Sequence, residues 1–344
     1  MTTRYVSLLA EPGSPGAAGE AAMEFAGNDV AAALAFAQEL GRIAPVPGSG
    51  STRDVWEGLA ILGAFDLGVA RAVEPHLDAI AILDQAGIPP EQLGAADATW
   101  GVFAAEGGDD PLTATRVDGR WTLTGTKPWC SLADQLDHAL VTAHMAEGQR
   151  GLFAVALRDG SVTVPGGQWH ARGLSEIPSG PVIFRAAAAT QVGDAGWYLA
   201  RPGFAWGGIG VAACWYGGAV GLARALFARA GESPDPIMAT HLGAVDQQLQ
   251  SARRALAEAA ELVDLGPKSA SGSVLAKRVR GTVADACEAV LQHVAHALGP
   301  APLALDEQHA KRVVDLELYI RQHHAERDAA SLGSAIARES VSPW

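Results

Sequence analysis

The segment from Trp121 to Ala133 decides the fold: Trp-Thr-Leu-Thr-Gly-Thr-Lys-Pro-Trp-Cys-Ser-Leu-Ala. Directly before it, Val117-Asp-Gly-Arg120 contains the Asp-Gly dipeptide that is typical of two-residue hairpin turns. In Trp121-Thr-Leu-Thr, large apolar residues alternate with threonine, which is the period of a strand with one buried face. The segment therefore predicts the second strand of a hairpin, which ends in a loop that carries Trp129 and Ser131.

Strand signals continue on both sides of this hairpin, from about residue 100 to residue 195. Short apolar runs recur at close spacing between glycine and proline breaks. They are Ala139–Ala143, Gly151–Leu157, Val162–Val164 and Pro181–Phe184. Many short, closely spaced strands predict a small β-barrel or sandwich.

Both flanks of this zone are helical by periodicity. Residues 1–99 predict an N-terminal helical domain, which includes a helix over Leu67–Gln85. Residues 196–344 predict four helices joined by short loops rich in proline and glycine, which indicates a helix bundle. The predicted fold class is α+β, with domains over 1–99, 100–195 and 196–344.

Composition limits the classes of partner. The chain has 344 residues, of which 49% are apolar and 18% are charged, and its formal net charge is −13. So few charges over so many apolar residues predict interfaces between subunits, and we expect a homo-oligomer. The negative charge argues against nucleic acid and anionic membranes, since both require clustered basic residues.

The three cysteines and the N-terminal segment indicate the cellular compartment that we expect. Cys130, Cys214 and Cys287 form no Cys-x-x-Cys pair, and a reducing cytoplasm fits them best. Met1–Gly19 lacks the pattern of a signal peptide. Phe204–Phe227 is long and apolar enough to span a membrane, but we favour a helix buried on all sides in the core of an oligomer.

Several linked motifs resemble the acyl-CoA dehydrogenase family of FAD-dependent flavoproteins. They are the hairpin Asp118–Ser131, the following strand Ala133–Ala143, the stretch Trp169–Val182 and a shortened loop over Val102–Asp110. The resemblance extends from a helix over Arg71–Asp78 to one over Asp315–Gly333. It implies α,β-dehydrogenation of an acyl-CoA thioester, with electrons passing to an electron-acceptor flavoprotein.

The resemblance also implies a flavin site. Trp129 would pack its indole against the isoalloxazine ring, and Ser131 would place a hydroxyl near the reactive edge. The backbone of Phe103, Ala104 and Ala105 would pass the ring system. From the residues alone, Trp129 is interpreted as an ordinary core tryptophan on a strand, and the surrounding motifs favour flavin contact instead. For Ser131, a strand-end cap stays open as an alternative. Arg229 is near the position of the arginine that, in the family, reaches the FAD of a neighbouring subunit.

The family's catalytic glutamate is missing. Ile320 stands at its usual position and Gly207 at its second known position, and neither side chain accepts a proton. His324 is the remaining candidate base, four residues before Asp328 in the segment Arg321–Asp328. The alternative is a solvated helix face with local ion pairs.

Two further groups of titratable residues have structural interpretations. His293 and His296 have the spacing of a metal-binding pair, but no third ligand is evident in the sequence, so we predict no metal. Glu74, His76 and Asp78 lie near Arg71 and are interpreted as structural.

Three functions remain open. The first is an FAD-dependent acyl-CoA dehydrogenase with an unrecognised base. The second is a catalytically degenerate subunit of a heteromer with a paralogue, which the missing glutamate motivates. The third is a flavin-dependent monooxygenase or oxidase on the same fold, which needs no base for an α-proton.

Overall fold

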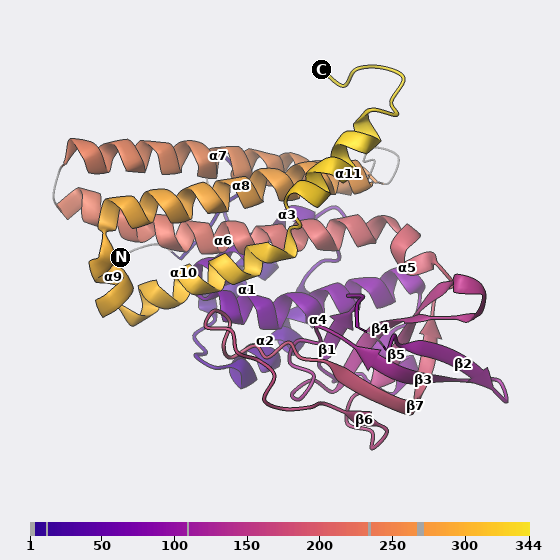
Figure 1. The fold of residues 1–344 in the computed structure, drawn as a ribbon. Helices are drawn as coiled ribbons and strands as arrows, with labels where there is room; N and C mark the ends of the chain where they lie inside the picture. Colours follow the sequence, from indigo (N-terminus) through magenta and orange to yellow (C-terminus); the bar gives the residue numbers. More distant parts are fainter. Residues whose placement is uncertain (1–3, 12, 109, 233–234, 267–271) are drawn as a thin grey trace.

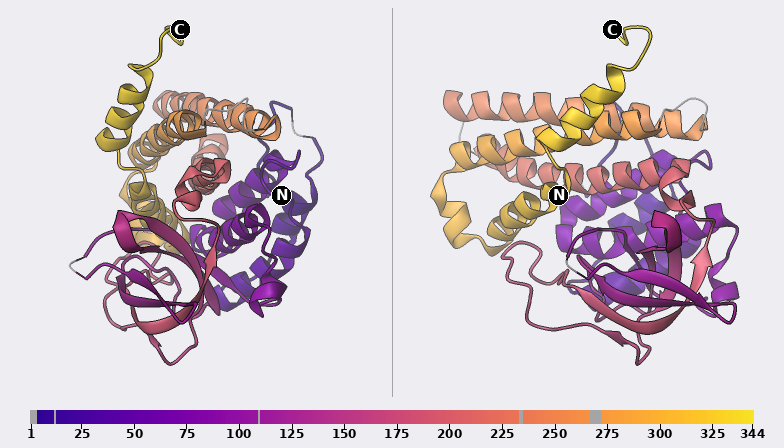
Figure 2. Two further views of the ribbon diagram at one scale, coloured as in Figure 1. Left: turned by 90° about the vertical axis from the view of Figure 1, so that its right-hand side faces the viewer. Right: turned by 45° about the vertical axis from the view of Figure 1, so that its right-hand side comes forward.

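The computed structural model describes residues 4–11, 13–108, 110–232, 235–266 and 272–344. A layer of N-terminal helices and a bundle of C-terminal helices pack together, and a small β domain lies against both (Figure 1). In both views of Figure 2 the β domain lies below the bundle, and the segment after the last helix projects away from the body. The N-terminal helices are α1 (Ala17–Glu24), α2 (Val30–Ile43), α3 (Thr52–Phe65) and α4 (Leu67–Ala86), and a short turn of 3-10 helix follows at Pro90–Leu93.

The β domain is a closed barrel of five strands with two further strands attached. The ring runs β4–β5–β7–β3–β2 and returns to β4 through the single pair Thr113–His144. β1 extends from β4, and β6 pairs with β7. The strands are β1 (Trp100–Phe103), β2 (Thr113–Val117), β3 (Arg120–Lys127), β4 (His138–His144), β5 (Arg150–Ala156), β6 (Val162–Thr163) and β7 (Val182–Val192). The predicted α+β class with a central β-barrel is confirmed.

The predicted hairpin forms between β2 and β3. Asp118 and Gly119 both adopt left-handed backbone angles, with φ of 49° and 79°. A two-residue turn of this kind matches the right-handed twist of the strands that it joins. The Asp-Gly dipeptide therefore fixes the register in which Trp121 pairs with Arg116.

Four long helices make up the C-terminal bundle, with three short helices around them. The long ones are α6 (Pro202–Glu232), α7 (Pro236–Asp264), α8 (Gly272–Leu298) and α10 (Glu307–Tyr319); the short ones are α5 (Trp197–Ala200), α9 (Pro300–Leu305) and α11 (Glu326–Ile336). The continuous helix predicted over Asp315–Gly333 is wrong. α10 ends at Tyr319, a 3-10 turn follows, and Ala325 adopts a φ of 43° before α11 begins.

Helix α6 is the apolar segment that could also have been a membrane span. It is the one helix among the described residues with the length and hydropathy of a span, and 67% of its most apolar window is buried inside the protein. It contacts α3, α4, α7, α8 and α10. Its packing is that of a core helix, which agrees with the choice of a buried helix over a membrane span.

Close contact between α3 and α6 depends on glycine. A Cβ atom at Gly217 would lie 2.1 Å from the backbone oxygen of Ala60, and one at Gly63 would lie 2.5 Å from that of Cys214. Backbone atoms cannot move aside as a flexible side chain can. The small residues therefore set the distance between the two helices.

We predict that Gly217→Ala lowers the free energy of unfolding by at least about 1–3 kcal/mol, because the methyl group forces the two backbones apart. Gly231→Ala in the same helix is the matched control, since a Cβ there meets no atom within 4 Å. The control should be neutral or stabilising by up to about 1 kcal/mol. Urea unfolding of both variants measures the difference, and equal effects would contradict the packing argument.

Candidate functional site

The loop after β3 presents Trp129 on the surface of the β domain. The Trp129 backbone is left-handed, with a φ of 59°, and its side chain is 62% exposed. Two backbone hydrogen bonds hold the loop, from Cys130 N–H to the Gly180 carbonyl at 2.9 Å and from Leu132 N–H to the Pro178 carbonyl at 2.8 Å. A left-handed conformation costs a non-glycine residue about 1–3 kcal/mol, so surrounding contacts must maintain it. Trp129 is thus not a core tryptophan.

Lys127, just before this loop, ties it to the segment that follows β1. Its buried Nζ lies 2.8 Å from Glu106 Oε1 and 2.8 Å from Thr142 Oγ1. Burial alone would raise the pKa of Glu106, but the neighbouring Lys127 and Arg150 outweigh it and hold that pKa below its ordinary value. The ion pair therefore fixes the segment after Phe103 next to the Trp129 loop.

The three predicted backbone contacts lie on and after β1. Phe103 is a core residue with 2% exposure, Ala104 is half-buried and Ala105 is exposed. Phe103 and Ser131 line the same small cavity of about 10 Å³, together with Arg71. The structure therefore brings Ser131 and Phe103 together.

Ser131 connects the β domain to helix α4. Its buried hydroxyl oxygen accepts a hydrogen bond from Arg71 Nη2 at 2.9 Å and lies 2.7 Å from the Ser179 hydroxyl. Arg71 also lies 3.6 Å from Glu74 and stacks 5.8 Å from the centre of the Tyr319 ring. One guanidinium thus joins the β domain, α4 and the bundle.

Two acidic side chains follow Arg71 on the same face of α4. Glu74 and Asp78 are one helical turn apart, with side chains 9% and 19% exposed. Burial raises the pKa of Glu74 to about 7, although Arg71 acts against the shift. Burial also raises the pKa of Asp78, with Arg201 acting against it. Both carboxyl groups thus hold protons more tightly than carboxyl groups in water.

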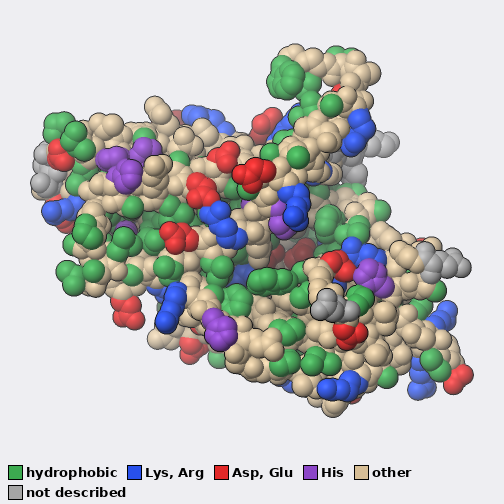
Figure 3. All heavy atoms as spheres, viewed as in Figure 1, with side chains coloured by type: hydrophobic (Ala, Val, Ile, Leu, Met, Phe, Trp, Pro, Cys, Tyr) green, Lys and Arg blue, Asp and Glu red, His purple; other side chains and the backbone are tan. Residues whose placement is uncertain are grey.

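Glu74 and Asp78 lie in the wall of the main cavity. The cavity measures about 640 Å³ and is bounded by α4, α5, the first half of α6, α8 and the turn before α11. A smaller space of about 40 Å³ adjoins it along α4 and α6 and shares both carboxylates. Figure 3 shows that the protein surface is hollowed between the bundle and the β domain. A volume of this size suits a small-molecule ligand.

Basic groups surround these carboxylates. Arg201 lies 3.7 Å from Asp78 and donates to Gln85 at 2.8 Å, while its Nε is buried without a hydrogen-bond partner among the described residues. Arg280 donates to the carbonyls of Gly208 and Gln322 at 2.6 and 3.0 Å. Arg201 Nε is one of seven buried side-chain N or O atoms without a hydrogen-bond partner among the described residues, and Arg201 lines the cavity.

The two positions of the missing glutamate have different surroundings. Ile320 is buried, with 2% exposure, in the turn after Tyr319. Gly207 lines the main cavity, and a Cβ there would lie 2.6 Å from Asp78 Oδ1. The space for a side chain at position 207 is therefore filled by a carboxylate from another helix.

His324 lines the cavity, but not on a helix face. It precedes α11, its side chain is 62% exposed, and its backbone N–H donates to Asp328 Oδ2 at 3.0 Å. The predicted arrangement of His324 and Asp328 one turn apart within a continuous helix is wrong, because the turn at 320–325 interrupts the helix. The neighbouring His323 is more enclosed, and burial lowers its pKa.

All three α4 residues that the sequence interpreted as structural make structural contacts, and two of them also line the cavity. His76 Nδ1 accepts the backbone N–H of Trp100 at 3.2 Å, and burial lowers its pKa to about 4, so it is a neutral link between α4 and β1. Glu74 and Asp78 line the cavity, which the sequence interpretation missed. The available signal was the spacing of Arg71, Glu74 and Asp78, which gives an apolar helix one charged stripe.

Arg229 lies far from the cavity. It is exposed near the end of α6, 3.4 Å from Glu232. At 1.5 Å per residue, it is about 33 Å along the helix from Gly207. Within one chain it cannot join the residues at the cavity.

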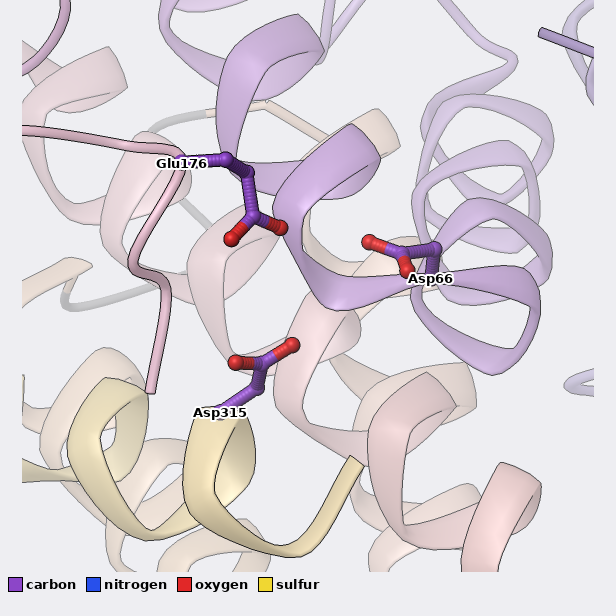
Figure 4. Close-up of side chains that lie close together, drawn as sticks. All are labelled: Asp66, Glu176 and Asp315. Carbon is purple, nitrogen blue, oxygen red and sulfur yellow. The ribbon is translucent and has the colours of Figure 1, made fainter. Parts of the chain in front are cut away.

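Two other clusters resemble metal sites. The carboxylates of Asp66, Glu176 and Asp315 converge from three segments (Figure 4). The Lys311 Nζ lies 2.9, 2.7 and 2.6 Å from them, respectively. Burial opposes the charge on Lys311, but the carboxylates hold its pKa above its ordinary value. The cluster is thus an ion network that docks α10 on the start of α4, with lysine offsetting part of its negative charge.

The histidine pair gains a third member in the structure. His241 of α7 lies with Nδ1 3.0 Å from Nδ1 of His293. The rings of His241 and His296 meet edge to face, with centres 5.9 Å apart. The third histidine could not be assigned from sequence, because it lies on another helix.

Known proteins share this architecture. No protein-family model and no curated protein sequence matches the chain. The chain is similar in structure to the dibenzothiophene monooxygenase TdsC from Paenibacillus sp. A11-2, with a TM-score of 0.77 and 19% identity over 95% of this chain and 98% of that one. It is also similar to the butyryl-CoA dehydrogenase of Megasphaera elsdenii, with a TM-score of 0.76 and 17% identity over 88% and 90% of the two chains.

A third similar structure is KijD3 in complex with FMN and a dTDP-linked amino sugar, with a TM-score of 0.76 and 18% identity over 96% of each chain. These proteins carry different names and ligands on one arrangement of helices and barrel. The resemblance found in the segment from Trp121 to Ala133 is confirmed at the level of the fold: the chain has the acyl-CoA dehydrogenase fold.

Proposed function

We propose that this protein is a flavin-dependent oxidoreductase that removes a proton and a hydride from adjacent carbons of an acyl-CoA thioester. The observation that carries the proposal is the cavity of about 640 Å³ with the buried carboxylates Glu74 and Asp78 in its wall. Abstraction of a carbon-bound proton needs a base shielded from water, and the cavity contains such groups. The similarity to butyryl-CoA dehydrogenase supports the same class of reaction.

The residues at the β domain fit a flavin. Trp129 offers an exposed indole on a backbone held in a strained conformation, and such a surface suits stacking against a planar ring. We propose FAD as the cofactor, held between the β domain and the bundle; when bound, it would accept the hydride. We also propose that the exposed Arg229 contacts the cofactor of a second subunit, either a copy of this chain or a paralogue.

Basic groups of the chain would bind the substrate. Arg201, Lys277 and Arg280 line the cavity, and the buried Arg201 Nε has no acceptor among the described residues. A thioester carbonyl or an anionic group of the substrate would supply that acceptor. We further propose a cytoplasmic protein that passes electrons to a second flavoprotein; its three cysteines are free and buried.

A flavin-dependent monooxygenase is the second candidate. His323 and His324 line the cavity, and the similar structures include TdsC with FMN and indole. This activity would use FMN or FAD and molecular oxygen and would need no carboxylate base. The two candidates therefore differ in the reaction of the flavin: an acyl-CoA reduces it in the dehydrogenase, and molecular oxygen reacts with the reduced form in the monooxygenase.

Trp129 tests the cofactor site. We predict that Trp129→Ala weakens flavin binding by about two- to tenfold, because loss of a stacking aromatic removes about 0.5–1.5 kcal/mol. Trp344→Ala is the matched control, since Trp344 is 94% exposed near the chain terminus. Titration with FAD and, separately, FMN, followed by flavin fluorescence, gives both affinities. Equal affinities for the two variants would remove Trp129 from the site.

The visible spectrum of the reconstituted protein tests the reaction. We predict that anaerobic addition of a short-, medium- or long-chain acyl-CoA bleaches the flavin band near 450 nm, since hydride transfer leaves a reduced flavin. Oxygen uptake is then measured with flavin reduced by other means. No bleaching with any acyl-CoA, together with rapid oxygen uptake in the presence of an aromatic substrate, would favour the monooxygenase.

A further inference from the structure

We infer that Asp78 of α4 is the proton acceptor of this site and that it occupies the place of the side chain that Gly207 of α6 lacks. The inference rests on the proposed function and extends it by naming the base. In the step, the bond between the substrate α-carbon and its proton breaks, and an O–H bond forms on Asp78. The electron pair stays on the substrate as a thioester enolate.

The geometry at position 207 supports a base that is supplied by α4 and not by α6. A Cβ at Gly207 would lie 2.6 Å from Asp78 Oδ1 and 3.2 Å from Asp78 Cγ. The Asp78 carboxylate on α4 therefore lies directly beside position 207 of α6, where a side chain on α6 would begin. That position borders both the main cavity and the smaller adjoining space.

Asp78 is better placed than Glu74 to meet a substrate. Its side chain is 19% exposed, compared with 9% for Glu74. Its cationic neighbour Arg201 is 3.7 Å away, too far for a direct hydrogen bond. Glu74 contacts Arg71, which is bound to Ser131, so Glu74 is a positioning residue whose charge acts on Asp78.

The surroundings of Asp78 suit a proton acceptor. Burial raises the pKa of Asp78, which makes its carboxylate a stronger proton acceptor than one in water. Arg201 acts against this rise in pKa by favouring the ionised form. The charged and titratable groups that face Asp78 and Glu74 from α4, α5, the start of α6, α8 and the α11 turn are Arg71, Tyr198, Arg201, Lys277, Arg280, His323, His324 and Asp328.

The test uses 3-thia-acyl-CoAs of short, medium and long chain, which bear acidic α-protons but whose sulfur replaces the carbon that would lose hydride. The flavin-loaded protein is incubated with each compound in D₂O, and loss of the α-proton signal is followed by NMR. Because no electrons are transferred, exchange reports proton abstraction alone. Wild-type protein should catalyse exchange.

Asp78→Asn should lower the exchange rate by about 100-fold or more, because a general base contributes about 10²–10⁴. Asp84→Asn is the matched control: it changes an exposed residue of the same helix and should leave exchange unchanged. Flavin absorbance and thermal unfolding of each variant show whether the fold is kept.

A carboxylate returned to α6 gives the decisive variant. In Asp78→Ala/Gly207→Asp, the Cβ of the new aspartate lies close to where the Asp78 carboxylate was. The new carboxylate should therefore raise the exchange rate at least tenfold above that of Asp78→Ala. A purely structural role of Asp78 predicts no such recovery. Glu74→Gln should keep the exchange activity, but the exchange rate should begin to rise at a lower pH. Removal of the neighbouring negative charge lets Asp78 lose its proton more easily.

Two outcomes would overturn the inference in distinguishable ways. If Asp78→Asn exchanges at the wild-type rate while wild type is bleached by acyl-CoA, the proposed function stands and the base is another residue. If wild type neither exchanges α-protons nor is bleached by any acyl-CoA, the proposed function fails and the assignment of Asp78 fails with it.

Discussion

The contacts of Arg71 are the interaction on which the arrangement of this protein depends. Its guanidinium binds Ser131 of the β domain, lies beside Glu74 of its own helix and stacks near Tyr319 at the end of α10. These three partners come from the three parts of the chain. A buried cation needs such partners, because removal from water costs more than any one of them returns. The β domain and the bundle are thereby held around α4, and the carboxylates on that helix come to face the cavity.

Around Arg71, each part of the chain is held in place by a different kind of contact. The glycines of α3 and α6 set a short distance between the helices through backbone contact. Lys311 docks α10 on the start of α4 through its ion pair with Asp66. The barrel positions the Trp129 loop through the ion pair between the buried Lys127 and Glu106. Together these contacts hold an exposed aromatic surface and a cavity lined by both acidic and basic side chains in one body.

Much of the fold followed from local pattern, whereas the site did not. The Asp118-Gly119 turn, the alternation after Trp121 and the position of α4 depend on neighbours in sequence, and these predictions were confirmed. The break after Tyr319 was missed because helical periodicity continues across it. The sequence interpreted Asp78 as structural, because its proximity to Gly207 arises from the packing of two helices and leaves no pattern along the chain. No spacing along the chain reveals which side chain fills the space above a glycine.

The contact between Gly207 and Asp78 has a consequence for how this chain can change over generations. A side chain at 207 would meet the carboxylate of Asp78, since less than 3 Å separates the Cβ position from the carboxylate oxygen. The carboxylate is the free end of a side chain, so Asp78 can relieve the contact by turning away. A substitution at 207 would therefore act mainly on where this carboxylate lies in the cavity and little on the packing of α4 against α6. Residues 78 and 207 are thus expected to change together over generations, although they lie on different helices.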